Sequence, residues 1–160
     1  MDVTATLDAP HPPEVVFPWV ADLDRYPSWL DIVPRAQADG DGAWLVWLRG
    51  RLGPLARSKR LRMRRTSLDA GRSVRFERDE RDGRQHSPWV LSAEVAAAPG
   101  GSRLTMHLHY GGGLFGPVLE RLLGDEIERS KARLLAVLSD QHGEPPAPLP
   151  ADAEGQAERR

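Results

Sequence analysis

Apolar and polar residues alternate along much of the chain, and a period of two is typical of strands that bury one face. In the first such segment the side chains of Val3, Ala5 and Leu7 share a face. Later segments of the same kind, bounded by turn residues, lie at about 32–38, 44–52, 58–67, 73–81, 89–95 and 103–110. The pattern predicts about seven strands, the later ones forming an antiparallel meander with one solvated face.

Helical periodicity is found near both ends of the chain. Pro12 and Pro13 suit the first turn of a short helix, which Pro18 shortens or bends. A second short helix follows and ends near Trp29. A long helix is predicted from Pro117 to about Gln141, with an apolar stripe of Val118, Leu119, Leu122, Leu123, Ile127, Leu134, Leu135 and Leu138. The order of elements is strand, two small helices, six strands and one long helix, which is an α+β arrangement.

Two glycine-containing segments indicate turns. The segment from Arg81 to Arg84 contains Asp-Gly, which predicts a tight hairpin because these residues tolerate the positive φ that such turns require. The segment from Gly111 to Gly113 precedes the long helix but lacks the Gly-Lys-Ser/Thr ending of a phosphate loop. We therefore expect it to be a hinge.

The composition is that of a globular protein, with 160 residues, 40% of them hydrophobic and 28% charged. These values favour one domain at residues 1–141, followed by a disordered tail rich in Pro, Ala and Glu at 142–160. The absence of cysteine excludes disulfides, thiolate metal sites and cysteine nucleophiles. The sequence shows neither a secretory leader nor an apolar stretch of ~20 residues, so we expect a cytoplasmic protein with no transmembrane segment.

The five histidines are candidate metal ligands or catalytic groups. His107 and His109 share one face of a strand, which would allow them to bind a metal together. That face lies opposite the apolar row, so two surface histidines are the favoured interpretation. His11, His86 and His142 lie in a loop, beside a turn and at the tail, and none belongs to a triad motif. We expect no metal site.

Arg60, Arg62 and Arg64 alternate with apolar residues and so form a basic stripe on the outer sheet face. The favoured interpretation is cross-strand pairing with Glu77 and Asp79. The alternative is a surface for nucleic acid or anionic membrane. The aromatic residues lie on the opposite face, and the formal net charge is -1, so we expect no nucleic-acid partner.

The segment from Ala9 to Trp29 contains Ala9-Pro, Glu14-Val-Val-Phe and, from Val20, Val-Ala-Asp-Leu-Asp-Arg-Tyr-Pro-Ser-Trp. This pattern, together with the element order over residues 1–141, resembles the START/polyketide-cyclase superfamily (SRPBCC). The resemblance implies a helix-grip fold, in which a curved antiparallel sheet wraps around the long carboxy-terminal helix. It also implies a deep apolar cavity for lipids, polyketides, quinones or other hydrophobic small molecules. It does not define a reaction, because the fold has many functions.

Mapped onto this chain, the cavity would be lined by inward residues of the strands and by the start of the long helix. These residues are Leu61, Met63, Phe76, Trp89, Leu91, Leu104, Met106, Leu108, Tyr110, Phe115, Leu119 and Leu122. The candidate polar groups in the same rows are Lys59, Arg65, Arg78 and the hydroxyl of Tyr110.

The leading hypothesis is a protein, monomeric or homodimeric, that binds or carries a hydrophobic small molecule without a cofactor. The second is a cyclase or dehydratase, without a metal or organic cofactor, in which Arg78 and Tyr110 orient an enol or carbonyl. The third is an interaction module that uses the basic stripe. No set of residues matches the catalytic groups of such cyclases one by one, which favours the first hypothesis.

Overall fold

The computed structural model describes residues 1–49, 59–112 and 116–142. The strands are β1 (Asp2–Ala9), β2 (Arg35–Ala38), β3 (Ala43–Leu48), β4 (Lys59–Asp69), β5 (Ser73–Arg78), β6 (Trp89–Ala98) and β7 (Gly101–Tyr110). The helices are α1 (Pro13–Val16), α2 (Pro18–Ala21), the 3₁₀ helix η1 (Leu23–Ser28) and α3 (Gly116–His142). The predicted tail lies outside the described residues, apart from His142, the last residue of α3.

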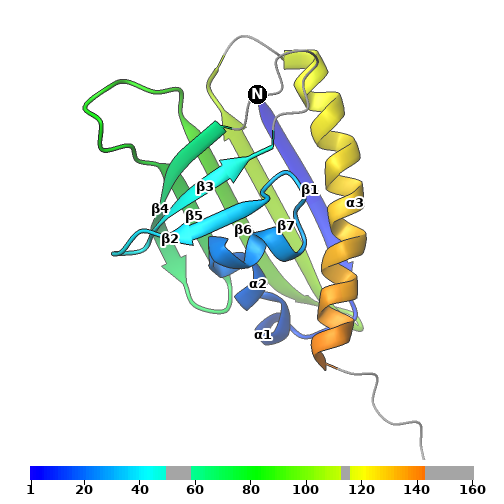
Figure 1. Cartoon of the computed structure of the whole chain (residues 1–160). Coiled ribbons are helices and arrows are strands. Elements are labelled where there is room, and N and C mark those ends of the chain that lie inside the picture. Colours follow the sequence, from blue (N-terminus) through cyan, green and yellow to red (C-terminus); the bar gives the residue numbers. More distant parts are fainter. Residues whose placement is uncertain (50–58, 113–115, 143–160) are drawn as a thin grey trace, which may run out of the picture.

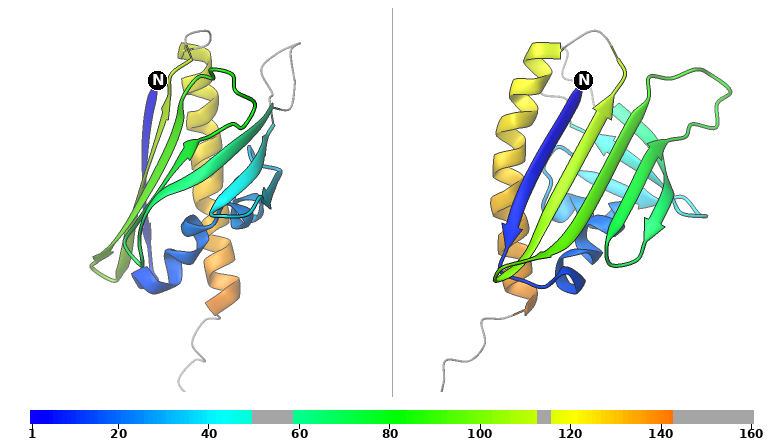
Figure 2. Two further views of the ribbon diagram at one scale, coloured as in Figure 1. Left: turned by 90° about the vertical axis from the view of Figure 1, so that its left-hand side faces the viewer. Right: turned by 180° about the vertical axis from the view of Figure 1, so that it is seen from behind.

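The seven strands form one antiparallel sheet in the order β1-β7-β6-β5-β4-β3-β2. The sheet curves without closing, and α3 lies along the β1 edge on its concave side (Figures 1 and 2). The short helices α1 and α2 cover the end of the concave side where the carboxy-terminal half of α3 also lies (Figure 1). The predicted α+β helix-grip architecture is confirmed.

Proline positions explain why the amino-terminal helices are short. Pro13 begins α1 and Pro18 begins α2, at helix positions where a missing N–H costs least. The amide of Phe17 still donates to the Pro13 carbonyl at 2.8 Å, but Pro18 has no N–H with which to continue the ladder. The predicted break at Pro18 is confirmed, and a third helical turn, η1, completes the segment.

Aromatic side chains from η1, β3 and β5 fill the concave side of strands β3 to β5. The ring centroid of Phe76 lies 6.5 Å from that of Tyr26 and 5.6 Å from that of Trp44, both nearly edge-to-face. The Tyr26 and Trp29 ring centroids are 4.8 Å apart. The buried Tyr26 hydroxyl donates to the Val20 carbonyl at 2.9 Å, and burial raises the pKa of Tyr26. We call this part, β3 to β5 with η1, the filled side.

The predicted basic stripe is not a fully solvated row, because Arg62 is only 3% exposed. Its guanidinium donates to Asp39 at 2.8 Å and to Asp79 at 3.2 Å, and Arg64 reaches Asp79 at 2.8 Å. Pairing with Asp79 is therefore confirmed. Glu77 pairs instead with Arg75, at 3.4 Å. Arg62 is buried because the β2–β3 turn and the segment after β5 both bring carboxylates over it.

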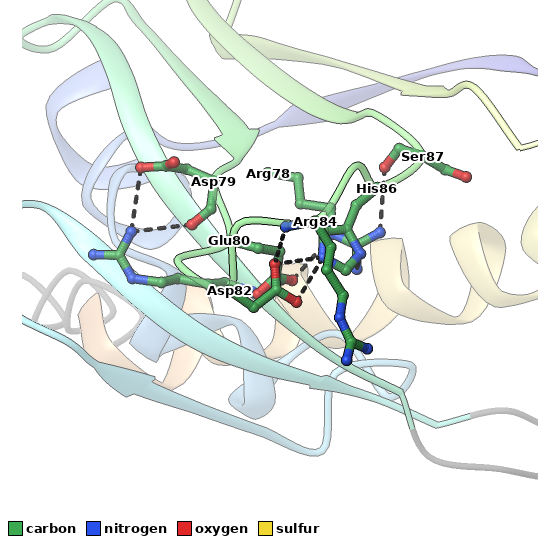
Figure 3. A network of polar contacts seen from close by, with 8 residues as sticks. Arg78, Asp79, Glu80, Asp82, Arg84, His86 and Ser87 are labelled. Atoms are coloured by element: carbon green, nitrogen blue, oxygen red, sulfur yellow. Dashed lines mark hydrogen bonds and ion pairs between the residues drawn. The ribbon is translucent and has the colours of Figure 1, made fainter.

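The tight hairpin predicted at Asp82 and Gly83 is wrong, because β5 ends at Arg78 and β6 begins at Trp89. The tip does turn locally, since Gly83 has a φ of 70° and the Arg84 amide donates to Asp82 at 3.0 Å. Polar contacts across the wide loop, drawn in Figure 3, take the place of strand pairing. Asp-Gly thus defines the tip of the loop and not the strand register.

Candidate functional site

A cavity of about 130 Å³ lies between α3 and the inward rows of β1, β6 and β7. The lining residues are Val3, Ala5, Thr6, Leu7, Trp29, Leu30, Ile32, Leu91, Leu104, Met106, Leu108, Leu123, Glu126, Ile127, Ser130, Lys131 and Leu134. Most of them are aliphatic, which is typical of sites for small apolar molecules. We call β1, β7 and α3 the hollow side of the molecule.

Small side chains explain why this side is hollow. Ala5 occupies the middle of the inward row of β1, directly opposite Met106. Across the cavity, Ser130 of α3 stands between the lining residues Ile127 and Leu134 and is 3% exposed. Neither Ala5 nor Ser130 reaches far, and no aromatic ring enters from β1 or β7 to fill the gap.

The polar groups of α3 beside the cavity are paired within the helix. The Ser130 hydroxyl donates to Glu126 at 3.3 Å, and Arg129 donates to the other carboxylate oxygen of Glu126 at 2.9 Å. Lys131 donates to Glu128 at 2.8 Å. These pairs satisfy the buried Glu126 and Ser130, so the helix can present mainly carbon atoms to the cavity.

Four of the twelve residues expected at the cavity line it: Leu91, Leu104, Met106 and Leu108. The structure places three others, Leu61, Met63 and Phe76, in the core of the filled side, where they are 2%, 6% and 0% exposed. Trp89 and Tyr110 lie beyond the cavity at one end. Phe115 lies outside the described residues, as do the side chains of Leu119 and Leu122.

Several lining residues were not among those expected. Val3, Ala5 and Leu7 belong to the apolar row recognised on the first strand, but that row was not connected to the cavity. Leu123 and Ile127 belong to the recognised stripe of the long helix, one and two turns beyond the positions chosen. The apolar row is visible in the sequence in both cases. The sequence does not show that α3 lies along β1, which is what makes these two rows line the cavity.

Trp89 and Tyr110 form an aromatic pair at the end of the inward rows. The strand register pairs Leu91 with Leu108 and, two residues further, Trp89 with Tyr110. Their ring centroids are 4.7 Å apart. The Lys59 ammonium lies 6.0 Å from the Trp89 centroid. The apolar walls of the cavity thus lead to an aromatic pair with a cation beside it.

Arg78, a candidate catalytic group, is held in place by three neighbours. It donates to Glu80 at 3.0 Å and to the Ser87 carbonyl at 3.2 Å, and it contacts Nδ1 of His86 at 3.2 Å (Figure 3). Its side chain is only 8% exposed. These contacts tie the start of the β5–β6 loop to its end, so Arg78 has a clear structural role.

His86 is engaged through both ring nitrogens. Nδ1 faces the Arg78 guanidinium, which can only donate, so Nδ1 accepts and Nε2 donates to Asp82 at 2.8 Å. This hydrogen bond and the one that the Arg84 amide donates lower the pKa of Asp82. With both nitrogens occupied, His86 is positioned to hold the loop and not to accept a proton from a substrate.

The other polar candidates lie apart from the cavity. Arg65 donates to the Ala21 carbonyl at 3.0 Å and to Asp22 at 3.1 Å, tying α2 to the sheet. His107 and His109 both face Asp2 on the outer side, at 3.3 and 2.9 Å. Among the described residues no group of three or more His, Asp or Glu side chains could hold a metal ion. Within the same residues, no helix is both long and apolar enough to span a bilayer.

The sequence profile of a family described as "Polyketide cyclase / dehydrase and lipid transport" matches residues 1–139. The chain belongs to this family. The resemblance seen in the segment from Ala9 to Trp29 is thereby confirmed. No curated protein has a matching sequence.

Solved structures of other proteins have the same fold. A START superfamily protein from Mycobacterium smegmatis has a TM-score of 0.68 at 13% identity, covering 88% of this chain and 98% of that one. The AHSA1 protein from Silicibacter pomeroyi has a TM-score of 0.59 at 21% identity, covering 89% of this chain and all of the other, 100%. A protein from Chromobacterium violaceum gives 0.65 at 15% identity, with 86% and 96% covered. At these identities the likeness shows the fold alone.

Proposed function

We propose that this protein binds a small hydrophobic molecule in the cavity between α3 and strands β1, β6 and β7. The observation that carries the proposal is a lining made mainly of aliphatic side chains, in a protein that packs the other part of its concave side with aromatic rings. Empty apolar volume destabilises a folded protein, and a hydrophobic occupant offsets that cost.

The volume limits the part of the molecule that can be enclosed. An engineered apolar cavity of about 150 Å³ accommodates benzene, and this one has about 130 Å³. A single ring or a short alkyl chain therefore fits without rearrangement. A larger lipid or polyketide would have to leave part of its length outside, or α3 would have to move away from β1.

The enzymatic alternative has less support. The family description includes cyclases and dehydrases, but Arg78 has three partners and both nitrogens of His86 are engaged. The alternative of an interaction surface on the basic stripe is weakened by the ion pairs that Arg62 and Arg64 make with Asp79. Binding or carriage of a ligand remains the function that the geometry supports best.

The methionines provide a direct test. Met106 lines the cavity, whereas Met63 lies in the core of the filled side. In protein labelled with ¹³C at the methionine methyl groups, toluene should shift the Met106 resonance in a saturable manner and leave that of Met63 nearly unchanged. Equal shifts at both, or none at Met106, would contradict the proposal.

A cavity-filling variant completes the test. Ala5→Leu should abolish the toluene effect at Met106, because the longer side chain takes the space of the ligand. The control is Ala96→Leu, the same substitution at an exposed residue of β6. It should bind toluene like the unmodified protein.

A further inference from the structure

The inward rows that line the cavity continue into a polar and aromatic layer. On β6, Trp89 lies two positions before the lining residue Leu91, and on β7, Tyr110 lies two positions after the lining residue Leu108, so each is roughly 7 Å further along its strand. Lys59 lies beside this pair on β4, with its ammonium 6.0 Å from the Trp89 ring centroid. An apolar chain seated in the cavity would therefore have this layer at one end.

The charges in this layer are unbalanced. Arg78 is paired with Glu80 at 3.0 Å. Within residues 1–49, 59–112 and 116–142, no carboxylate lies within ion-pair distance of the Lys59 ammonium. Partial desolvation and the neighbouring Arg78 lower the pKa of Lys59, while Glu80 acts in the opposite direction. Lys59 is thus an exposed cation beside the Trp89 ring, with no carboxylate partner among these residues.

A hydrogen-bond donor at the same place also has no partner. The Nε1 atom of Trp89 is buried, and it has no acceptor among the residues that the structure describes. Buried indole N–H groups usually find an acceptor. Among the described residues, this layer therefore contains an ammonium without a carboxylate partner and, on the ring beside it, an N–H without an acceptor. The oxygen atoms of an anionic group are the kind of partner that both lack.

We propose that the ligand is an amphiphilic anion, with its apolar part in the cavity and its carboxylate or phosphate against Lys59, beyond Trp89 and Tyr110. This inference rests on the proposed function, since it adds a head group to the molecule that the cavity holds. It assigns Lys59 as the residue that selects the ligand and leaves Arg78 as a positioning residue. It also explains why this layer contains a lysine and aromatic residues with polar groups, because a purely apolar ligand would need neither.

The test compares three ligands with the same tail: octanol, octanoate and octyl phosphate. Titration calorimetry with the full chain at pH 7 should show octanoate binding about tenfold more tightly than octanol, because only octanoate can form a charge-assisted hydrogen bond. The affinity for octanoate should fall as salt is added, and the affinity for octanol should not. Octyl phosphate distinguishes the two head groups, since a site shaped for one should prefer it to the other.

Three variants assign the effect to one residue. Lys59→Met should remove the preference for octanoate and leave octanol binding unchanged, and Lys59→Arg should restore much of the preference. Arg60→Met is the matched control, because it removes one cation from the adjacent residue of β4, which is exposed like Lys59 but lies on the opposite face of the strand. It should retain the full preference for octanoate.

The outcomes separate this inference from the proposed function. If octanol binds but octanoate binds no more tightly, the anionic head group is wrong and the apolar site stands. If Lys59→Met weakens octanol and octanoate equally, or if Arg60→Met acts like Lys59→Met, the assignment to Lys59 is wrong. If none of the three ligands binds, the proposed function itself fails.

Discussion

The filled side and the hollow side share one sheet but differ in what packs against it. Beside β3 to β5, Tyr26 and Trp29 of the η1 region interlock with Trp44 and Phe76. Beside β1 and β7, α3 presents Ser130 and aliphatic side chains to a row that contains Ala5. Both sides show the same alternation of apolar and polar residues in the sequence. The difference between a packed core and a cavity therefore lies in side-chain volume and not in hydrophobic pattern.

The comparison predicts that shortening a side chain to alanine lowers the free energy of unfolding much more on the filled side than on the hollow side. Phe76→Ala should lower the free energy of unfolding by about 3–5 kcal/mol, because Phe76 is fully buried among aromatic rings that cannot collapse into the space. Leu108→Ala should cost only about 1–2 kcal/mol, because Leu108 already borders the cavity and loses fewer contacts. Urea denaturation of both variants measures the difference.

A milder variant covers the case in which Phe76→Ala does not fold. Phe76→Leu keeps most of the volume and should cost less than Phe76→Ala by at least about 1 kcal/mol. Equal losses for Leu108→Ala and Phe76→Ala would show that the hollow side is as tightly packed as the filled side. The comparison would then be wrong.

A second prediction concerns the arginines behind the filled side. Arg62→Met should cost about 1–3 kcal/mol, because Arg62 is buried and holds two carboxylates and the Asp79 carbonyl. Arg64→Met should cost less than about 1 kcal/mol, because the Arg64 side chain is 34% exposed and makes one ion pair, with Asp79. Denaturation in low and high salt provides the measurement. If both variants lose a similar amount of unfolding free energy, the burial of Arg62 is not what makes its ion pairs stabilising.

The sequence was sufficient to predict the fold because each element carries a local signal. Proline positions gave the two short helices, and alternation gave the strands. The family resemblance in the segment from Ala9 to Trp29 gave the architecture. The loop between β5 and β6 was mispredicted because Asp-Gly describes only the local turn. The contacts that widen it, from Arg78 to Ser87 and His86, depend on residues brought together by folding.

The cavity was harder to predict than the fold. The period of the sequence shows which side chains of a strand point inward, but not which helix packs against them. Phe76 and Leu104 are both inward residues, yet one meets Tyr26 and the other meets α3. The row of Val3 and Ala5 became informative only once β1 was known to pair with β7 beside α3. The burial of Arg62 has the same explanation, since its cover comes from Asp39 and Asp79 in distant turns.

The smallest predicted effect contrasts two cations of β4: the buried Arg62 stabilises the fold, whereas Lys59, beside Trp89, should slightly destabilise it. The pKa of Lys59 is lowered from its usual 10.5, so the folded protein disfavours the charged form. This penalty is fully present below the lowered pKa and disappears as the pH rises through 10.5, where the unfolded chain also loses its proton. Lys59→Met should therefore be slightly more stable than the unmodified protein at pH 7, and the gain should vanish above pH 10.5.

Thermal unfolding at a series of pH values measures this gain, with Arg60→Met as the control that should show no such trend. A gain that persists at high pH would mean that packing, and not the charge of Lys59, is responsible, and the electrostatic contrast between Lys59 and Arg62 would then be wrong.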